Sequence, residues 1–242
     1  MAIQLLADGA PRLGEAAPYF EGRSTRGLVK LTDYRGQWLV FFAHPADFTP
    51  VCESEFVTFG RYAKQFKALN CELLGLSADT VQSHVSWIES LRRESGVTID
   101  FPIIEDPSLV IARRYRMTAS ETGEPAALRA LFVIDPNGIL RAMLHYPCST
   151  GRSVEEILRL VQALQIADQE RVLTPEGWQP GQSTLKSPPQ TVIAASGPSD
   201  LSYGCVDWYY YSNGANGQPK APGSARLVRR EPVLQPASVT HQ

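Results

Sequence analysis

The sequence lacks paired cysteines, long apolar runs and an excess of charge of either sign. Its four cysteines and four histidines are scattered over 242 residues without a C-x-x-C or any other ligand spacing, so we expect neither a thioredoxin-type dithiol nor a metal site. No apolar run approaches the roughly 18 residues of a membrane span. The first residues lack the basic region typical of a signal peptide. Few cysteines without a secretion signal predict a cytoplasmic location and no membrane partner.

The charge balance excludes a further class of partner. There are 23 basic and 25 acidic residues, a net charge of -2, which argues against nucleic acid or an anionic membrane surface as the main partner. Apolar residues make up 43% and charged residues 20%, as in soluble globular chains and unlike disordered ones. We therefore expect one large domain, or one domain with an accessory piece, around a real core.

Residues 1–167 alternate between strand and helix patterns. The apolar run Trp38–Ala43 predicts a strand buried on both faces. The helix expected from Pro50 to Leu69 has apolar residues at spacings of three and four. The other elements expected are a strand at Cys71–Ser77, a helix capped by Thr80 with Val81, Val85, Ile88 and Leu91 on one side, a strand at Phe101–Ile104, a helix at Ser108–Tyr115, a hairpin of Ala130–Ile134 with Ile139–Leu144, and a helix from Ser153 to about Ala167. This order predicts an α/β fold in which helices flank a mixed sheet.

The character of the sequence changes after about Asp168. Nine of the 18 prolines lie between Pro175 and Pro236, while large aromatic residues persist, including the run Trp208–Tyr211. A segment with little core of its own but many large apolar groups should pack on another surface. We therefore interpret residues 168–242 as an arm that docks on its own domain or on a second subunit, with loosely held residues from about Ser224.

The segment most informative about function joins the strand at Trp38–Ala43 to the helix that follows it. Thr49 is a suitable N-cap and Pro50 a suitable first helical residue, which places Cys52 in the first turn. Unpaired amides and the positive end of the helix dipole there favour the thiolate, the nucleophilic form of cysteine. A buried, inert cysteine is the alternative, but this position at the end of a strand favours a reactive one.

The motifs around this cysteine resemble the peroxiredoxins. Pro45, Thr49 and Cys52 form P-x-x-x-T-x-x-C, which is similar to that family's active-site signature. The longer string FFAHPADFTPVCESEF resembles the one-cysteine, peroxiredoxin-six type subfamily, and in particular its prokaryotic members with a C-terminal resolving cysteine. The resemblance covers roughly residues 1–215 and includes Arg129 in LRALFVID, the string YPCSTGR, and the segment TPEGWQPG that opens the arm. It implies a thioredoxin-like fold followed by a C-terminal dimerisation arm.

The resemblance implies a thiol-dependent peroxidase that needs no metal or organic cofactor and reduces hydrogen peroxide and small alkyl hydroperoxides. Cys52 would be the peroxidatic cysteine, whose thiolate attacks one peroxide oxygen to give a sulfenic acid. Thr49 and Arg129 would hold the sulfur and the peroxide through a hydroxyl and fixed N–H groups, and Pro45 would shield the sulfur from water. Plainer alternatives stay open at this stage: a helix cap for Thr49, a strand-edge surface charge for Arg129 and a strand terminator for Pro45.

Three further residues are supporting candidates. Glu55 and Arg152 match family positions that form a polar network near the site, although each could equally be a solvated charge at a helix. His44 is typical of the subfamily and could contact the sulfur or the peroxide. A satisfied buried histidine is the alternative.

Recycling of the oxidised enzyme depends on the remaining cysteines. Cys205 resembles a resolving cysteine, which in such relatives usually comes from the partner subunit; the alternative is a small residue buried in a dimer interface. Cys148 is a second resolving candidate, and Cys71 begins a predicted buried strand and is expected in the core. If neither Cys148 nor Cys205 reaches Cys52, the enzyme is truly one-cysteine and uses an external reductant, either a thioredoxin-like protein or a small-molecule thiol.

The resemblance also implies an assembly. We expect a homodimer with paired strand edges and exchanged arms, assembled further into a decamer. A redox sensor that passes its oxidation to another protein and a ring-forming holdase chaperone remain alternatives to the peroxidase. The lipase-like G-x-S-x-G of some subfamily members is absent, because the corresponding stretch Tyr34–Trp38 holds no serine, so a phospholipase activity is not supported.

Overall fold

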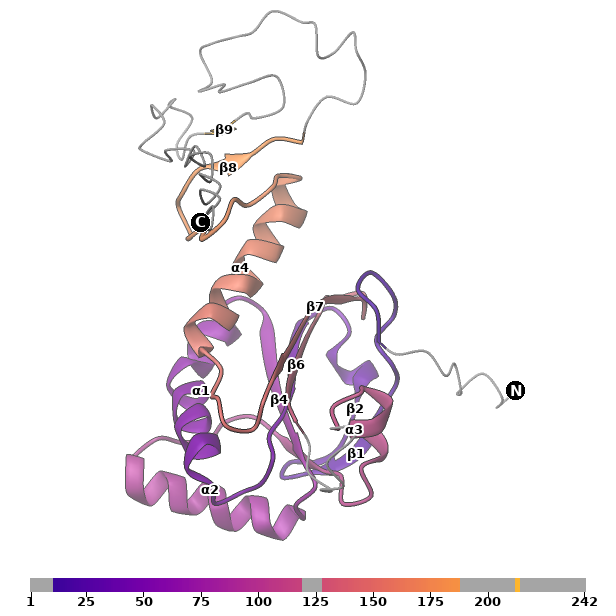
Figure 1. The fold of residues 1–242 in the computed structure, drawn as a ribbon, viewed down its shortest axis with the longest axis vertical. Helices are drawn as coiled ribbons and strands as arrows, with labels where there is room; N and C mark the ends of the chain where they lie inside the picture. Colours follow the sequence, from indigo (N-terminus) through magenta and orange to yellow (C-terminus); the bar gives the residue numbers. More distant parts are fainter. Residues whose placement is uncertain (1–10, 119–127, 188–211, 214–242) are drawn as a thin grey trace, which may run out of the picture. The chain divides into compact units, whose positions relative to one another are not determined.

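The computed structural model in Figure 1 describes residues 11–118, 128–187 and 212–213 of the chain. The chain divides into two compact units, Met1–Gln165 and Ile166–Gln242. The first unit holds a mixed sheet with helices, as the sequence predicts, and the second begins within helix α4 (Val154–Glu170).

A seven-stranded sheet in the order β2-β1-β5-β4-β3-β6-β7 forms the framework of the first unit. Strand β3 pairs in parallel with β4, and β4 with β5, whereas β6 is antiparallel to β3 and β7 to β6. The strands are β1 (Glu21–Ser24), β2 (Gly27–Lys30), β3 (Trp38–Ala43), β4 (Cys71–Ser77), β5 (Ile103–Glu105), β6 (Arg129–Ile134) and β7 (Leu140–Tyr146). The helices are η1 (Leu31–Tyr34, a 3-10 helix), α1 (Pro50–Ala68), α2 (Val81–Ser95), α3 (Val110–Arg114) and α4 (Val154–Glu170).

The two faces of the sheet are covered by different helices, and each face has its own apolar core. Alternate residues of β3 point to opposite faces, as the strand period requires. On one face Val40 and Phe42 pack with apolar residues of α1, α2 and the first turns of α4, while on the other Leu39 and Phe41 pack with α3 and the segment before β1. All six residues of β3 are buried, which confirms the strand predicted from the run Trp38–Ala43.

The structure corrects several details of the sequence prediction. Strands β1 and β2 were not predicted, and β5 begins at Ile103 rather than at Phe101. Helix α2 buries His84, Trp87 and Leu91. Of the expected stripe, Leu91 is buried and Ile88 packs against the core, but Val85 is 52% exposed, so its place in the stripe is wrong. The stripe is rotated because the large ring of Trp87 and the polar ring of His84 occupy the face that packs inward.

The second unit is described only in part. Strands β8 (Thr184–Leu185) and β9 (Ser212–Asn213) form an antiparallel pair, and Leu173 bridges to Leu185. Cys205, the aromatic run at residues 208–211 and the residues from Ser224 onward lie outside the described residues. Within the part of the chain that is described, no helix is long and apolar enough to cross a membrane.

Candidate active site

The candidate residues come together at one end of the sheet, where some strands end and others begin. Strand β3 ends at Ala43, and because β6 is antiparallel to it, with Phe42 opposite Leu131, the first residue of β6 lies at the same end. That residue is Arg129, and it pairs with Tyr146 at the end of β7. The residues after β3, the first residue of β6 and the residues after β7 are therefore neighbours at this end of the sheet, although they are far apart in the sequence.

Cys52 is placed by a sharp turn between β3 and α1. Phe48 adopts a left-handed backbone conformation (φ 55) that is unusual for a bulky residue. Thr49 is the N-cap and Pro50 the first helical residue, as predicted. The Thr49 hydroxyl does not cap the helix with a side-chain hydrogen bond; it donates to the Ala46 carbonyl at 2.8 Å, which leaves its lone pairs free to accept. The Cys52 side chain is fully buried in the first turn of α1.

Arg129 is the cation at the Cys52 sulfur. Its Nη1 lies 3.4 Å from Cys52 Sγ, and its Nε donates to the Cys148 carbonyl at 3.0 Å. The side chain is 3% exposed, so the alternative of a surface charge at the strand edge is wrong. An arginine held at two points presents N–H groups in a fixed direction, and its charge cannot be removed at physiological pH.

Glu55 and Arg152 complete a buried charged network around Arg129. Glu55 accepts from Arg129 Nη1 at 2.8 Å, and it accepts from the backbone N–H and the guanidinium of Arg152 at 2.7 to 2.9 Å. Burial would raise the pKa of Glu55, but the hydrogen bonds and charge of Arg152, together with the charge of Arg129, hold that pKa below its usual value. Arg152 also donates to the Ala130 carbonyl at 2.8 Å. Both residues are buried, so the alternative of solvated helix charges is wrong.

The charges of this network do not cancel. Two guanidinium groups, Arg129 and Arg152, face one carboxylate, Glu55, and all three side chains are at most 3% exposed. A buried positive charge without a counter-ion is costly, and the group next to Arg129 that can take a negative charge is the Cys52 thiol. The site is therefore electrostatically suited to an anionic sulfur.

His44 belongs to a second buried cluster. Its Nε2 lies 2.9 Å from Asp47 Oδ1, and the Nδ1 of His84 lies 2.8 Å from Asp47 Oδ2. The alternative of a satisfied buried histidine holds for the burial of His44 and for its Nε2, whereas its buried Nδ1 has no hydrogen-bond partner among the described residues. Burial lowers the pKa of His44, against the opposing effect of Asp47.

The sequence reasoning missed Asp47 and His84. Asp47 stands inside the motif string, and His84 is a polar residue at a helical spacing shared with Trp87 and Leu91. A histidine on the buried face of a helix indicates that a polar partner lies nearby. The sequence reasoning placed the apolar stripe of this helix on another face and therefore missed this signal.

The other cysteines differ in accessibility. Cys148 is an exposed free thiol on the loop after β7, and Cys71 is a buried one at the start of β4. Burial raises the pKa of Cys71, which fits the predicted core role. Pro45 is half-buried in the loop between β3 and α1. Cys205 lies outside the described residues, so its relation to Cys52 stays a prediction.

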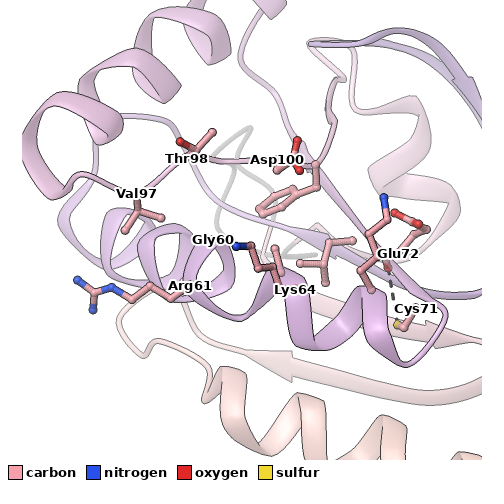
Figure 2. Close-up of a pocket in the computed structure, with 12 residues that line it drawn as sticks. Gly60, Arg61, Lys64, Cys71, Glu72, Val97, Thr98 and Asp100 are labelled. Carbon is pink, nitrogen blue, oxygen red and sulfur yellow. Dashed lines mark hydrogen bonds between the residues drawn. The ribbon is translucent and has the colours of Figure 1, made fainter.

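A surface pocket of about 500 Å³ lies elsewhere, between the second half of α1, the start of β4 and the segment 97–101 (Figure 2). It is lined by Arg61, Lys64 and Cys71 among others, and by none of the candidate residues above. A cavity of this size is not by itself a catalytic site. Among the residues that line this pocket, no thiol contacts a guanidinium as Cys52 contacts Arg129.

Comparisons with known proteins identify family models and relatives that agree with one another. Residues 13–143 match the model of the AhpC/TSA family, and residues 163–195 match the C-terminal domain of 1-Cys peroxiredoxin. A peroxiredoxin of Aquifex aeolicus is 46% identical over 210 residues, which cover 82% of this chain and 95% of that protein.

Two solved structures are similar to the described fold. A mutant of peroxiredoxin 6 of Arenicola marina has a TM-score of 0.70 and 37% identity, over 76% of this chain and 87% of that one. The yeast mitochondrial 1-Cys peroxiredoxin, whose thiol resolving mechanism involves glutathione and thioredoxin systems, has a TM-score of 0.73 and 32% identity, over 83% of this chain and 98% of that one.

Proposed function

Because the chain belongs to the peroxiredoxin family and is a thiol-dependent peroxidase with a thioredoxin-like fold, we propose that Cys52 is its peroxidatic cysteine. The observation that carries the proposal is the 3.4 Å contact between the buried Cys52 Sγ and Arg129 Nη1. Hydrogen peroxide and small alkyl hydroperoxides are the proposed substrates, because the sulfur lies in a buried site that favours small molecules.

The reaction follows from the charges at the site. The Cys52 thiolate attacks the terminal peroxide oxygen, the sulfur–oxygen bond forms as the oxygen–oxygen bond breaks, and the departing hydroxide or alkoxide takes a proton from water. Negative charge moves from the sulfur toward the departing oxygen. Arg129 is fixed at both ends of its guanidinium and can stabilise that charge throughout. Thr49, with its hydrogen committed to Ala46, accepts a hydrogen bond from the peroxide, and Pro45 limits access of water.

Substitution of the sulfur tests the assignment. Cys52→Ser should abolish peroxide consumption, because serine keeps the shape but forms no comparable nucleophile at neutral pH. Peroxide consumption with dithiothreitol as reductant is the measurement, and Cys71→Ser is the matched control, which should retain turnover. Peroxide turnover by Cys52→Ser at the wild-type rate would contradict the proposal.

Recycling is proposed to go through a second thiol. Cys205 is the first candidate, in the arm or from a partner subunit, and Cys148 is the second, because it is exposed and its carbonyl is bonded to the same Arg129 that touches Cys52. An external reductant remains the third route, and the yeast relative named above is resolved through glutathione and thioredoxin systems.

Mass spectrometry after stoichiometric peroxide separates these routes. A disulfide between Cys52 and Cys205 is expected, and Cys205→Ser should leave the first oxidation intact while slowing recycling by a dithiol. Cys148→Ala is the matched variant: a disulfide that disappears only in this variant assigns the role to Cys148. A sulfenic or sulfinic acid without any disulfide in wild type would identify a one-cysteine enzyme that uses an external thiol.

The assembly proposal rests on an edge strand and on the arm. Strand β7 ends the sheet order on one side, and an edge strand is a template for pairing with a second chain. We propose a cytoplasmic homodimer through this edge, with residues 168–242 as the dimerisation arm, assembled into a decamer. The molar mass of the full chain by light scattering tests this directly, and a monomer at micromolar concentration would contradict it.

A further inference from the structure

The pocket in Figure 2 lies where helix α1 lacks large apolar side chains. The helix lines it with Gly60, Ala63, Lys64 and Lys67 among others. These positions recur at helical spacing, so they form one stripe along α1. The segment after α2 approaches this stripe closely, since a β-carbon at Gly60 would lie 2.5 Å from Val97 Cγ1. The two small residues leave a hollow of about 500 Å³, a volume typical of small-molecule sites.

The buried part of the pocket lining is apolar and uncharged. Leu73 and Phe101 belong to it, and each is 3% exposed. Cys71 belongs to it as well, and because burial raises the pKa of its thiol, this thiol stays neutral at physiological pH. The ring of Phe101 is held in place against Phe42, with centroids 5.8 Å apart. An uncharged lining with a fixed ring favours a compact aromatic body over a phosphate or a sugar.

Two lysines lie at the exposed part of the lining. Lys64 and Lys67 are both exposed, and neither forms an ion pair with a carboxylate among the described residues. Lys67 lies in the last turn of α1, where the negative end of the helix dipole stabilises a cation. Lys64 lies one turn earlier, next to this like charge, which is a mildly unfavourable arrangement. Lys64 is therefore the cation of the pocket that an anionic ligand would stabilise most.

The two acidic residues of the lining leave room for an anion at Lys64. Asp100 is already paired with Arg26 at 2.7 Å. Figure 2 shows Glu72 at one end of the pocket, Thr98 at the other, and Lys64 between them. An anion on the Thr98 side of Lys64 therefore lies away from Glu72. On that side the ammonium of Lys64 and the hydroxyl of Thr98 are both able to donate to it.

We propose that this pocket is a binding site for a compact aromatic carboxylate, whose ring packs on Leu73 and Phe101 and whose carboxylate pairs with Lys64. The site is separate from the one proposed for peroxide. Lys64 lies roughly 18 Å from Cys52 along the axis of α1, at the helical rise per residue. The inference therefore does not rest on the proposed role of Cys52, and binding should leave the oxidation rate of Cys52 unchanged.

Calorimetric titration of the full-length reduced protein with 1-naphthoate tests the proposal. We expect a single molecule of 1-naphthoate to bind per chain. The alcohol 1-naphthalenemethanol keeps the ring but has no charge, and it should bind roughly tenfold more weakly, the effect of one hydrogen bond to a charged group. Octanoate keeps the charge but has no ring, and it should also bind more weakly, because a flexible chain loses more conformational freedom on binding.

Two variants assign the binding to this pocket. Lys64→Gln should weaken the binding of 1-naphthoate roughly tenfold and leave that of 1-naphthalenemethanol unchanged, because only the charge is removed. Ala63→Phe fills the hollow and should abolish the binding of both compounds. The matched control is Arg113→Gln, which removes an exposed cation of α3 on the other face of the sheet and should change neither affinity. If Ala63→Phe does not fold, Ala63→Leu replaces it, with the same expected direction.

Several results would overturn the inference. One is the absence of 1-naphthoate binding to the wild-type protein at millimolar concentration. Equal affinities for 1-naphthoate and 1-naphthalenemethanol, or equal losses in Lys64→Gln and Arg113→Gln, would exclude the role of Lys64. Equal affinities for 1-naphthoate and octanoate would exclude the aromatic class of ligand.

Two further results would assign the binding to something else. Displacement of 1-naphthoate by inorganic phosphate at constant ionic strength would identify a site for simple anions. Unchanged binding in a folded Ala63→Phe or Ala63→Leu variant would place the ligand outside this pocket. Failure of the proposed function looks different, since peroxide turnover by Cys52→Ser would remove the role of Cys52 and leave these titrations unaffected.

Discussion

Two buried polar clusters lie at the same end of the sheet, and they stabilise charge in different ways. The guanidinium cluster consists of Arg129, Arg152 and Glu55 around Cys52, and its groups carry fixed charges. The imidazole cluster consists of His44, Asp47 and His84, and its contacts depend on where protons lie. The first cluster presents fixed positive charge next to the Cys52 sulfur, whereas the second holds one carboxylate between two imidazole rings.

The two clusters differ in how their charges and hydrogen bonds respond to pH. Guanidinium groups do not titrate at physiological pH, so the electrostatic environment of the sulfur is constant across that range. An imidazole changes its hydrogen-bonding pattern when its tautomer or charge changes. The guanidinium cluster therefore keeps one charge pattern, whereas the contacts of the imidazole cluster depend on pH.

The largest expected effect comes from breaking the guanidinium cluster at its only carboxylate. Glu55→Gln keeps the shape but leaves Arg129 and Arg152 without their shared counter-ion. Removing one partner of a buried ion pair costs about 3–5 kcal/mol, so the free energy of unfolding in urea should fall by about that amount. The control is Glu89→Gln, an exposed partner of Arg92, which should change stability by less than about 0.5 kcal/mol. Equal, small effects for both variants would show that the buried cluster contributes no special stability.

The second effect concerns the contact with the sulfur. Arg129→Gln removes the charge at 3.4 Å from Cys52 Sγ, and loss of one such donor at a reacting centre lowers rates by about 10²–10³-fold. Stopped-flow measurement of Cys52 oxidation by hydrogen peroxide checks this, with Arg92→Gln as the exposed arginine control. A wild-type rate in Arg129→Gln would show that this contact does not assist the oxidation of Cys52.

The sequence was sufficient for the local parts of this site. Strand β3, the N-cap Thr49 and the first-turn placement of Cys52 follow from apolar runs and capping preferences within a short stretch. Arg129 was identified through the family resemblance alone, because its pattern next to an apolar strand is equally typical of a surface charge. Its burial depends on α1 covering the end of β6, which no local pattern reports.

The imidazole cluster could not be predicted because its members come from separate elements. Asp47 and His84 are 37 residues apart, and their contact requires the correct face of α2. The apolar pattern of α2 favoured a stripe through Val85, whereas packing of the Trp87 ring against His44, with centroids 5.3 Å apart, selects the face that carries His84. Similarly, the short strands β1 and β2 pair antiparallel with each other, and β1 also pairs with β5; neither strand carries much pattern of its own.

The smallest expected effect separates the two clusters by pH. Burial lowers the pKa of His44 from its ordinary 6.5, so the unfolded chain binds this proton first, and stability should fall as pH drops below about 6.5. The lowered pKa of Glu55 acts in the same direction only below its ordinary 4.5. In urea unfolding between pH 7 and 5, His44→Gln should flatten the slope by at most about 1.4 kcal/mol per pH unit, while His145→Gln, whose imidazole is exposed, should flatten it less. Since Glu55 contributes nothing in that window, an unchanged slope in His44→Gln would mean that His44 is not held neutral, and the expected difference in pH response between the two clusters would fail.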